Sequence, residues 1–220
     1  MLNFDLNNKN FTANIVGIEA QAKDVYIPHY AFSLIGKEPR KKYIIRKIGK
    51  DSFYSHKNIR TVSFSKDSEI QLIEQRAFSN SSIENISIPK QVLRIEDECF
   101  SNCKKLKKVQ ITEDSNLVYL GKKIFFNSSI ESIFIPKNLK EIDQSILLKT
   151  SKLKTILISP ENEYFSNYKN KMIINKKDNH IVFVQRNIEE LTIPSFINQI
   201  NSYSFHLCNK LKYVDIKYRQ

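Results

Sequence analysis

Two stretches of the sequence are almost the same: NSSIENISIPK at residues 80–90 and NSSIESIFIPK at residues 127–137. They begin 47 residues apart and differ only where Asn85 corresponds to Ser132 and Ser87 to Phe134. Self-similarity at a fixed period is the signature of a repeat architecture, in which each copy adds one structural unit to a stack. The pair therefore predicts a repeat protein.

A short apolar-x-apolar motif lies inside each copy and recurs along most of the chain. Such alternation over a few residues indicates a β-strand that buries one face. From the first clear copy the steps are 24, 23, 24 and 23 residues, so the 47-residue identity covers two consecutive repeats. A step of 35 residues follows, and then one of 23. The first apolar residues of these motifs, which we expect to point inward from parallel strands of one sheet, are Val62, Ile86, Val109, Ile133, Ile156, Leu191 and Val214, with Val25 as an earlier copy.

A second motif, here called the cassette, follows most of these strands. It consists of an apolar residue, four mostly polar or small residues and then Phe or Leu, as in IEQRAF at residues 73–78 and IEDECF at residues 95–100. A strand followed by one apolar-anchored helical or irregular turn cannot bury its own apolar face, but stacked copies can. The sequence therefore predicts an α/β solenoid, rich in β-structure, with one short parallel strand per repeat of 23–24 residues.

The combined pattern, an I-x-I-P strand followed by a cassette that ends in F-x-x-C, resembles the BspA-like leucine-rich repeats of bacterial and protist surface antigens. Residues 83–103 carry the resemblance most clearly, and it extends over residues 25–216. The resemblance implies a right-handed leucine-rich-repeat coil that functions in adhesion or host-matrix recognition, with a protein or glycoconjugate as ligand. It also implies a two-stranded excursion in the longer repeat, residues 156–190. The residues themselves predict a hairpin there, because MII at 172–174 and IVFV at 181–184 flank a polar turn.

The chain is predicted to form one elongated unit with a cap at its amino end. Residues 1–24 hold two apolar segments around the turn NNKN, which indicates a capping hairpin, and residues 25–220 hold about eight repeats. The final repeat stops one strand past a cassette without a polar cap, which predicts self-association at this carboxyl-terminal end.

The compartment stays open at the level of sequence. The opening residues lack a secretory signal, and no window is apolar enough to span a membrane. These features favour the cytoplasm, where the chain would be a protein-interaction scaffold, whereas the family resemblance implies the cell surface.

A formal net charge of +12 raises the alternative of polyanion binding, to a glycan or a nucleic acid. An AT-rich coding sequence also produces much Lys, Asn and Ile, so net charge without a located patch identifies no partner. The basic clusters that would carry this alternative are Arg40, Lys41, Lys42, Lys104, Lys105, Lys107, Lys108, Lys122 and Lys123.

One column of the predicted sheet alternates in charge without a break. Opposite charges in lateral register stabilise strand pairing, so we interpret this column as register control. It also makes nucleic acid an unfavourable partner for that face, because carboxylates recur on every second strand. The column, at the first outward position of each strand, is Arg60, Glu84, Lys107, Glu131, Lys154, Glu189 and Lys212.

The cysteines and histidines give no indication of catalysis. Cys103 and Cys208 occupy one position of the repeat, where other repeats place Ser, Thr or His. Such a position favours a small, partly buried corner over metal ligation or a nucleophile. The four histidines are scattered, and the sequence has no Gly-rich phosphate loop, nucleophile elbow or zinc-like spacing. We therefore expect no enzymatic activity, no metal site and no cofactor.

The residue between the two apolar positions of each strand should point away from the core. Most of these residues are polar, but Phe134 and Leu157 place two large apolar side chains next to one another, and Tyr213 adds an aromatic ring in the neighbouring column. Clustered exposed apolar groups often mark an interface. We predict that Phe134, Leu157 and Tyr213 bind a partner or a second copy. The alternative is that the long repeat folds its hairpin over Phe134 and Leu157 and buries them.

Overall fold

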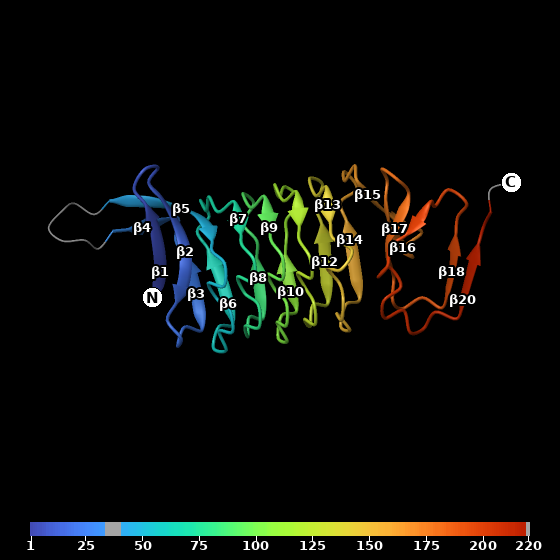
Figure 1. Ribbon diagram of the computed structural model, residues 1–220, viewed down its shortest axis with the longest axis horizontal. Coiled ribbons are helices and arrows are strands. Elements are labelled where there is room, and N and C mark those ends of the chain that lie inside the picture. Colours follow the sequence, from blue (N-terminus) through green and yellow to red (C-terminus); the bar gives the residue numbers. More distant parts are fainter. Residues whose placement is uncertain (34–40, 219–220) are drawn as a thin grey trace.

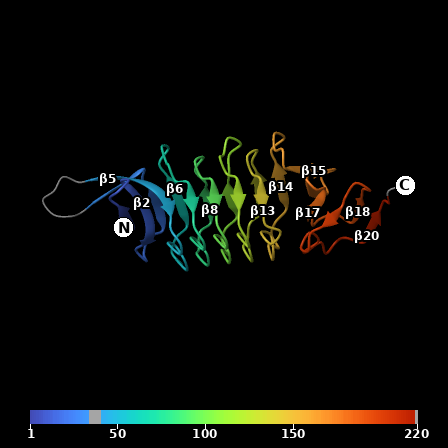
Figure 2. The same cartoon turned by 45° about the horizontal axis from the view of Figure 1, so that its top comes forward.

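The computed structural model describes residues 1–33 and 41–218, which form an elongated coil of short strands (Figure 1). Successive coils lie side by side along the long axis (Figures 1 and 2). They run from the hairpin of β1 (Leu2–Asn7) and β2 (Thr12–Ile18) to the last strands, β18 (Glu190–Ile193) and β20 (Tyr213–Ile216). The predicted solenoid is confirmed. The described residues contain no helix, so the structure corrects the α/β class to β-strands and turns alone.

One strand of each regular coil joins a six-stranded parallel sheet. The strands pair in the register that the apolar motifs predict: Val25 lies opposite Val62, and Ile133 lies opposite Ile156. Their inward side chains are buried. In spatial order the strands are β3 (Asp24–Ile27), β6 (Thr61–Phe64), β8 (Asn85–Ser87), β10 (Lys108–Gln110), β12 (Ser132–Ile135) and β14 (Thr155–Ile158).

A second sheet of eight strands forms another side of the coil. Its regular members are parallel, and the last residue of each of these strands is the first residue of a cassette. They are β5 (Lys42–Ile48), β7 (Leu72–Ile73), β9 (Arg94–Ile95), β11 (Tyr119–Leu120) and β13 (Glu141–Ile142). β4 (Tyr30–Phe32) pairs antiparallel with β5.

The amino-terminal hairpin covers the first coil. β1 (Leu2–Asn7) pairs antiparallel with β2 (Thr12–Ile18), and β2 pairs parallel with β5. The side chains of β1 alternate between half-buried and exposed. Leu2, Phe4 and Leu6 pack against the core, whereas Asn3 and Asp5 face solvent. The hairpin thus presents polar residues beyond the end of the stack.

A ladder of phenylalanine rings runs through the core beneath the cassettes. Four rings lie nearly parallel, with centroids 4.8, 5.4 and 5.9 Å apart from one pair to the next. Full burial of such a side chain contributes about 1.5–3 kcal/mol of hydrophobic free energy. Leu147 takes the next position and is also buried. The rings belong to Phe53, Phe78, Phe100 and Phe125.

Each cassette forms turns rather than a helix, because its backbone bonds to the neighbouring coil. The amide of Phe53 donates to the carbonyl of Ala77 at 2.7 Å, and that of Phe100 donates to the carbonyl of Ile124 at 2.9 Å. Positive φ values within the cassettes also interrupt helical geometry. A further position with positive φ, two residues after the cassette phenylalanine, is repeatedly asparagine, which tolerates this conformation better than most residues: Asn80 (60°), Asn102 (58°) and Asn127 (56°).

The long repeat interrupts this regular stack. β15 (Phe165–Tyr168), β16 (Met172–Asn175) and β17 (His180–Val184) are antiparallel neighbours, and β17 pairs parallel with β19 (Gln199–Ile200). The predicted hairpin is confirmed by the pairing of β16 with β17.

The excursion also ends the six-stranded sheet at β14. β18 (Glu190–Ile193) and β20 (Tyr213–Ile216) form a separate two-stranded sheet, because β15 to β17 follow β14 where the next regular strand would pair. The expectation that Leu191 and Val214 would share one sheet with the earlier strands is therefore wrong. Leu191 is buried, but Val214 is 44% exposed because no further strand covers β20 within the described residues.

Candidate binding surface

The outer face of the six-stranded sheet is mostly polar. Apart from Lys108, its two outward columns carry hydroxyl and amide side chains along the middle strands, and Ser87 donates a hydrogen bond to Gln110 at 3.2 Å. Small side chains leave a shallow trough of about 180 Å³ across β6, β8 and β10. The column that contains the candidate residues reads Tyr26, Ser63, Ser87, Gln110, Phe134 and Leu157.

Phe134 and Leu157 are neighbours in register on β12 and β14. Leu157 is 55% exposed, so the hairpin of the long repeat does not bury both residues. Phe134 is half-buried and packs against the core cluster. The two side chains therefore form an apolar patch on β12 and β14, next to the polar trough, and Leu157 is the more exposed of the two.

Tyr213 lies elsewhere. It is 68% exposed on β20, and its partner in register is Glu190 of the separate two-stranded sheet. The prediction that it belongs to the same patch assumed one continuous sheet, which the excursion interrupts. Sequence reasoning missed Tyr26, which occupies the column of Phe134 on β3 and is 59% exposed. The sequence could have identified it, because Tyr26 lies between the apolar residues Val25 and Ile27 just as Phe134 lies between Ile133 and Ile135.

The residues of the alternating charge column directly precede the strands, so their expected place at the first outward position of each strand is wrong by one residue, and the column is divided into two segments. Backbone hydrogen bonds join its members from Arg60 to Lys154, and Lys212 to Glu189, but none that we find joins Lys154 to Glu189 in the described chain. Side-chain ion pairs form between Lys154 and Glu131 at 3.4 Å and between Lys212 and Glu189 at 2.8 Å. The column therefore follows the break in the sheet.

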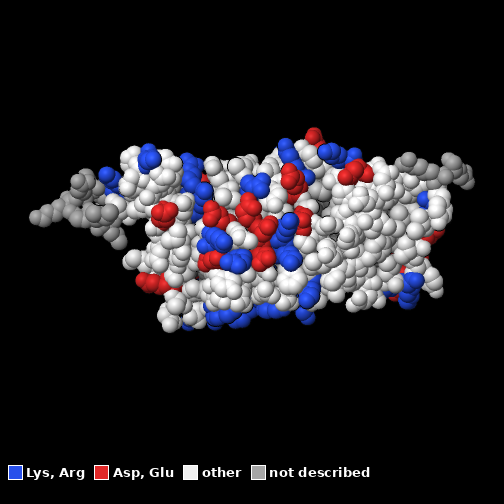
Figure 3. Space-filling model, in the orientation of Figure 1, with Lys and Arg blue, Asp and Glu red and all other residues white. Residues whose placement is uncertain are grey.

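The predicted basic clusters lie in different parts of the fold. Lys42 stacks over the ring of Tyr30, 3.4 Å from its centroid, near the amino end. Lys122 belongs to a cassette, where its amide donates to Asp97 at 2.8 Å. Arg40 lies outside the described residues. Figure 3 shows basic and acidic side chains interspersed over the middle coils. The remaining residues have these positions: Lys41 precedes β5, Lys123 follows Lys122 in the cassette, Lys108 begins β10, and Lys104, Lys105 and Lys107 lie in the turn before it.

The shared cysteine position is a small corner of the core. Cys103 is fully buried, and its thiol donates to the carbonyl of Phe78 at 3.0 Å. Burial raises the pKa of Cys103 to about 11, so the thiol stays neutral. Cys208 is half-buried, and burial raises its pKa as well. Neither cysteine forms a disulfide. Within residues 1–33 and 41–218, no group of three or more His, Cys, Asp or Glu residues is placed to hold a metal.

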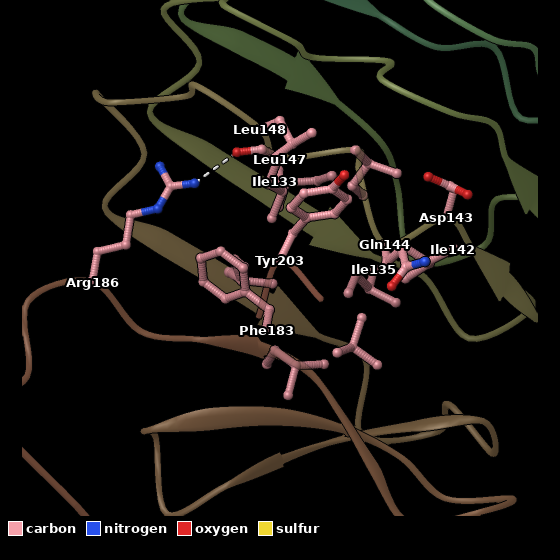
Figure 4. A pocket seen from close by; sticks show the side chains of 14 residues that line it. Ile133, Ile135, Ile142, Asp143, Gln144, Leu147, Leu148, Phe183, Arg186 and Tyr203 are labelled. Carbon is pink, nitrogen blue, oxygen red and sulfur yellow. Dashed lines mark hydrogen bonds between the residues drawn. The ribbon is translucent and has the colours of Figure 1, made fainter. Parts of the chain in front are cut away.

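A small apolar cavity marks the junction between the last regular coil and the excursion (Figure 4). It measures about 20 Å³, which is room for roughly one water molecule. Phe183 and Tyr203 face Leu147 and Ile133 across it. The cavity occurs where Leu147 replaces the phenylalanine of the ladder, and its size makes it a packing defect rather than a ligand site.

Arg186 lies beside this cavity and completes the last regular coil. Its Nη2 donates to the Leu147 carbonyl at 2.8 Å (Figure 4). Nη2 also donates to the Thr150 hydroxyl at 2.8 Å, and Nη1 donates to the Thr150 carbonyl. In a regular coil the equivalent carbonyl, that of His56, accepts from the amide of Ser82 at 3.0 Å. Arg186 thus replaces a backbone donor of the coil that the excursion displaces. Burial lowers its pKa to about 10.

The parallel coils and buried aromatic cassettes define a leucine-rich-repeat solenoid. The repeats match the BspA type leucine rich repeat region in six copies, over residues 25–154, 71–178 and 173–219. The chain belongs to this family. No curated protein matches the chain significantly.

Solved structures share the fold at low sequence identity. The pneumococcal vaccine antigen PcpA aligns over 98% of this chain with a TM-score of 0.78 and 20% identity, and the alignment spans 64% of PcpA. A leucine-rich repeat protein from Eubacterium ventriosum aligns over 97% of this chain and 59% of its own, with a TM-score of 0.68 and 18% identity. A leucine rich cell surface protein from Faecalibacterium prausnitzii aligns over 97% and 74%, with a TM-score of 0.58 and 16% identity.

In the described part of the chain, nothing forms a helix with the length and apolar character needed to cross a bilayer.

Proposed function

We propose that the chain is a non-enzymatic binding protein that holds a protein or glycoconjugate partner against the outer face of the six-stranded sheet. Members of its family are generally repeat proteins of the binding or adhesion type. Solenoids present extended surfaces that suit macromolecular partners. The observation that carries the proposal is the apolar pair of Phe134 and Leu157 beside the polar outer face of β6, β8 and β10.

Adhesion at a cell surface is the role that the relatives support. One solved structure is described as a cell surface protein and another as a vaccine antigen. The polar trough beside the apolar pair supplies hydroxyl and amide groups for hydrogen bonds, while Phe134 and Leu157 supply an anchor that loses water on binding. Such a combination suits an extended partner that crosses several coils.

The experiment measures binding of the purified chain to immobilised collagen, laminin and mucin, with Phe134→Ser as the test variant. This substitution copies the residue that the sibling strand carries at Ser87. We expect at least about a tenfold loss of affinity, because an interface anchor is worth more than about 1.4 kcal/mol. Tyr54→Ser is the control, since Tyr54 is an exposed aromatic in a cassette.

The outcome separates three cases. A selective loss in Phe134→Ser with a folded protein supports the proposal. Full binding by Phe134→Ser excludes the patch. If circular dichroism shows that Phe134→Ser unfolds, the side chain belongs to the core, and assignment of the outer face to binding is wrong.

A further inference from the structure

A hollow of about 610 Å³ opens at the edge where the turns lead into the six-stranded sheet. Two coils supply its lysines, and the coil between them has a Ser-Ser turn that leaves room. Figure 3 shows a row of basic side chains along the lower edge of the middle coils. The lining residues are Glu84, Lys104, Lys105, Lys107, Ser129, Glu131, Lys152 and Lys154.

The lysines of this edge follow a period of two coils. Lys105 and Lys152 are 47 residues apart, the same step that separates the two NSSIE stretches. Neighbouring strands lie about 4.8 Å apart, so the two turns are offset by about 10 Å along the coil. The single turn between them begins with one of the repeated asparagines, Asn127, which accepts a hydrogen bond from Lys104. The lysine-bearing turns therefore alternate with the Ser-Ser turns of the two near-identical stretches.

The charges inside the hollow do not cancel. Lys154 pairs with Glu131 at 3.4 Å. By contrast, we find no ion pair or side-chain hydrogen bond in the described residues for the ammonium groups of Lys105, Lys107 and Lys152, whose side chains are exposed. Glu84 likewise has no ion pair in this part of the chain. The hollow therefore offers three free cations and a free carboxylate to a ligand.

We propose that this hollow binds a sulfated polysaccharide, at a site separate from the apolar pair on the sheet. Sulfate groups would lie against the ammonium groups of Lys105, Lys107 and Lys152, and sugar hydroxyls would donate to the carboxylate of Glu84. A polyphosphate chain has no such hydroxyl donors. Single-stranded nucleic acid binds through aromatic stacking platforms, and no aromatic residue lines the hollow.

The test measures the affinity of the purified chain for a heparin oligosaccharide over a series of salt concentrations that starts at about 50 mM. The hollow variant is Lys105→Gln, Lys107→Gln, Lys152→Gln. The matched control is Lys122→Gln, Lys123→Gln, Lys177→Gln, which removes the same charge from a cassette and from the turn between β16 and β17. We expect the hollow variant to bind at least about tenfold more weakly and its salt slope to fall by about three, with little change in the control.

Two further anionic ligands test whether the hollow prefers a sulfated sugar over other polyanions. Inorganic polyphosphate and single-stranded DNA of similar charge are measured beside heparin, and both should bind more weakly. Equal losses in the hollow and control variants would show that binding follows the overall charge of the protein and would overturn the proposal. So would an absence of heparin binding at low salt, or a preference for polyphosphate or DNA.

Discussion

At the scale of the residue, Arg186 shows how one side chain maintains a coil beside an irregular repeat. Its guanidinium is largely buried and bonds to Leu147 and Thr150 in place of the backbone of a further coil. Both carbonyls also accept from their own coil, since Thr150 donates to Leu147 and the amide of Leu153 donates to Thr150, so loss of Arg186 removes charged hydrogen bonds without leaving a bare acceptor. A hydrogen bond to a charged group contributes about 1.5–3 kcal/mol. The stability of the last regular coil therefore depends on Arg186 more than its place in a loop indicates.

Replacement of Arg186 with methionine should lower the free energy of unfolding by about 2–3 kcal/mol, because two carbonyls and a hydroxyl lose a charged donor. Urea denaturation measures this change. Lys152→Met, at an exposed position, should stay within about 0.5 kcal/mol of the parent protein. An Arg186→Met protein as stable as the Lys152→Met protein would contradict the role assigned to Arg186.

For the two cysteines that share one position of the repeat, we expect substitution by serine to change stability little, in contrast to the replacement of Arg186. Cys103→Ser should be tolerated with a loss below about 1.5 kcal/mol, because the hydroxyl can donate to the Phe78 carbonyl as the thiol does and Ser81 already fills the same position. Cys208→Ser should behave alike. A loss above about 3 kcal/mol in urea denaturation, or metal found in the native protein by mass spectrometry, would overturn the structural role.

Residues differ in how far sequence could place them. Phe134 and Leu157 were predictable because the strand period of two assigns each side chain to a face. Arg186 was not, since its contact with Thr150 spans 36 residues across the irregular repeat. Lys152 lies 47 residues from Lys105, so the repeat period predicts that the two lysines lie on the same edge of the coil, although they are far apart in sequence.

At the scale of the element, the strands were predictable and the cassettes were not. The apolar-x-apolar motif locates every strand of the six-stranded sheet. The cassette sequence fits a helical or an irregular turn equally well, because its apolar residues lie five apart. Bonds to the neighbouring coil and positive φ values decide for turns, and neither is visible without the stack.

The charge column allows an element-level test. Glu131→Lys places three like charges in a row with Lys107 and Lys154, and should lower the free energy of unfolding by up to about 1 kcal/mol, since these exposed side chains are well solvated. The swapped pair Glu131→Lys, Lys154→Glu should recover part of the loss. Thermal denaturation at low salt measures both; equal stability of the two variants would mean that the column does not couple.

At the scale of the whole molecule, the 35-residue repeat divides the solenoid. The repeat period predicted the coil, but not the place where the sheet breaks. β15 to β17 pair with one another inside the long repeat, and the repeat pattern does not say which edge of β14 they will occupy. The two ends also differ. The β1–β2 hairpin presents polar residues at one end, whereas β20 exposes the core-facing Val214 and Ile216 at the other.

This asymmetry predicts that the 220-residue chain self-associates through β20 of two copies. Sedimentation velocity should show a concentration-dependent dimer, and Val214→Lys should weaken it because the substitution places a charge among the apolar groups. Tyr26→Lys, near the hairpin end, is the control. A monomer at all concentrations, or equal weakening by both variants, would exclude β20 as the contact.

The central claim is that the outer face of the six-stranded sheet binds the partner through Phe134 and Leu157, and hydroxyl-radical footprinting read by mass spectrometry tests it most directly. In the free chain Leu157 should react readily and its neighbour Ile156, which is 2% exposed, should not. Addition of a matrix ligand that the chain binds should protect Phe134 and Leu157 and leave Tyr54 reactive. Protection of Tyr54 with Leu157 unchanged, or a reactive Ile156 in the free chain, would contradict the account.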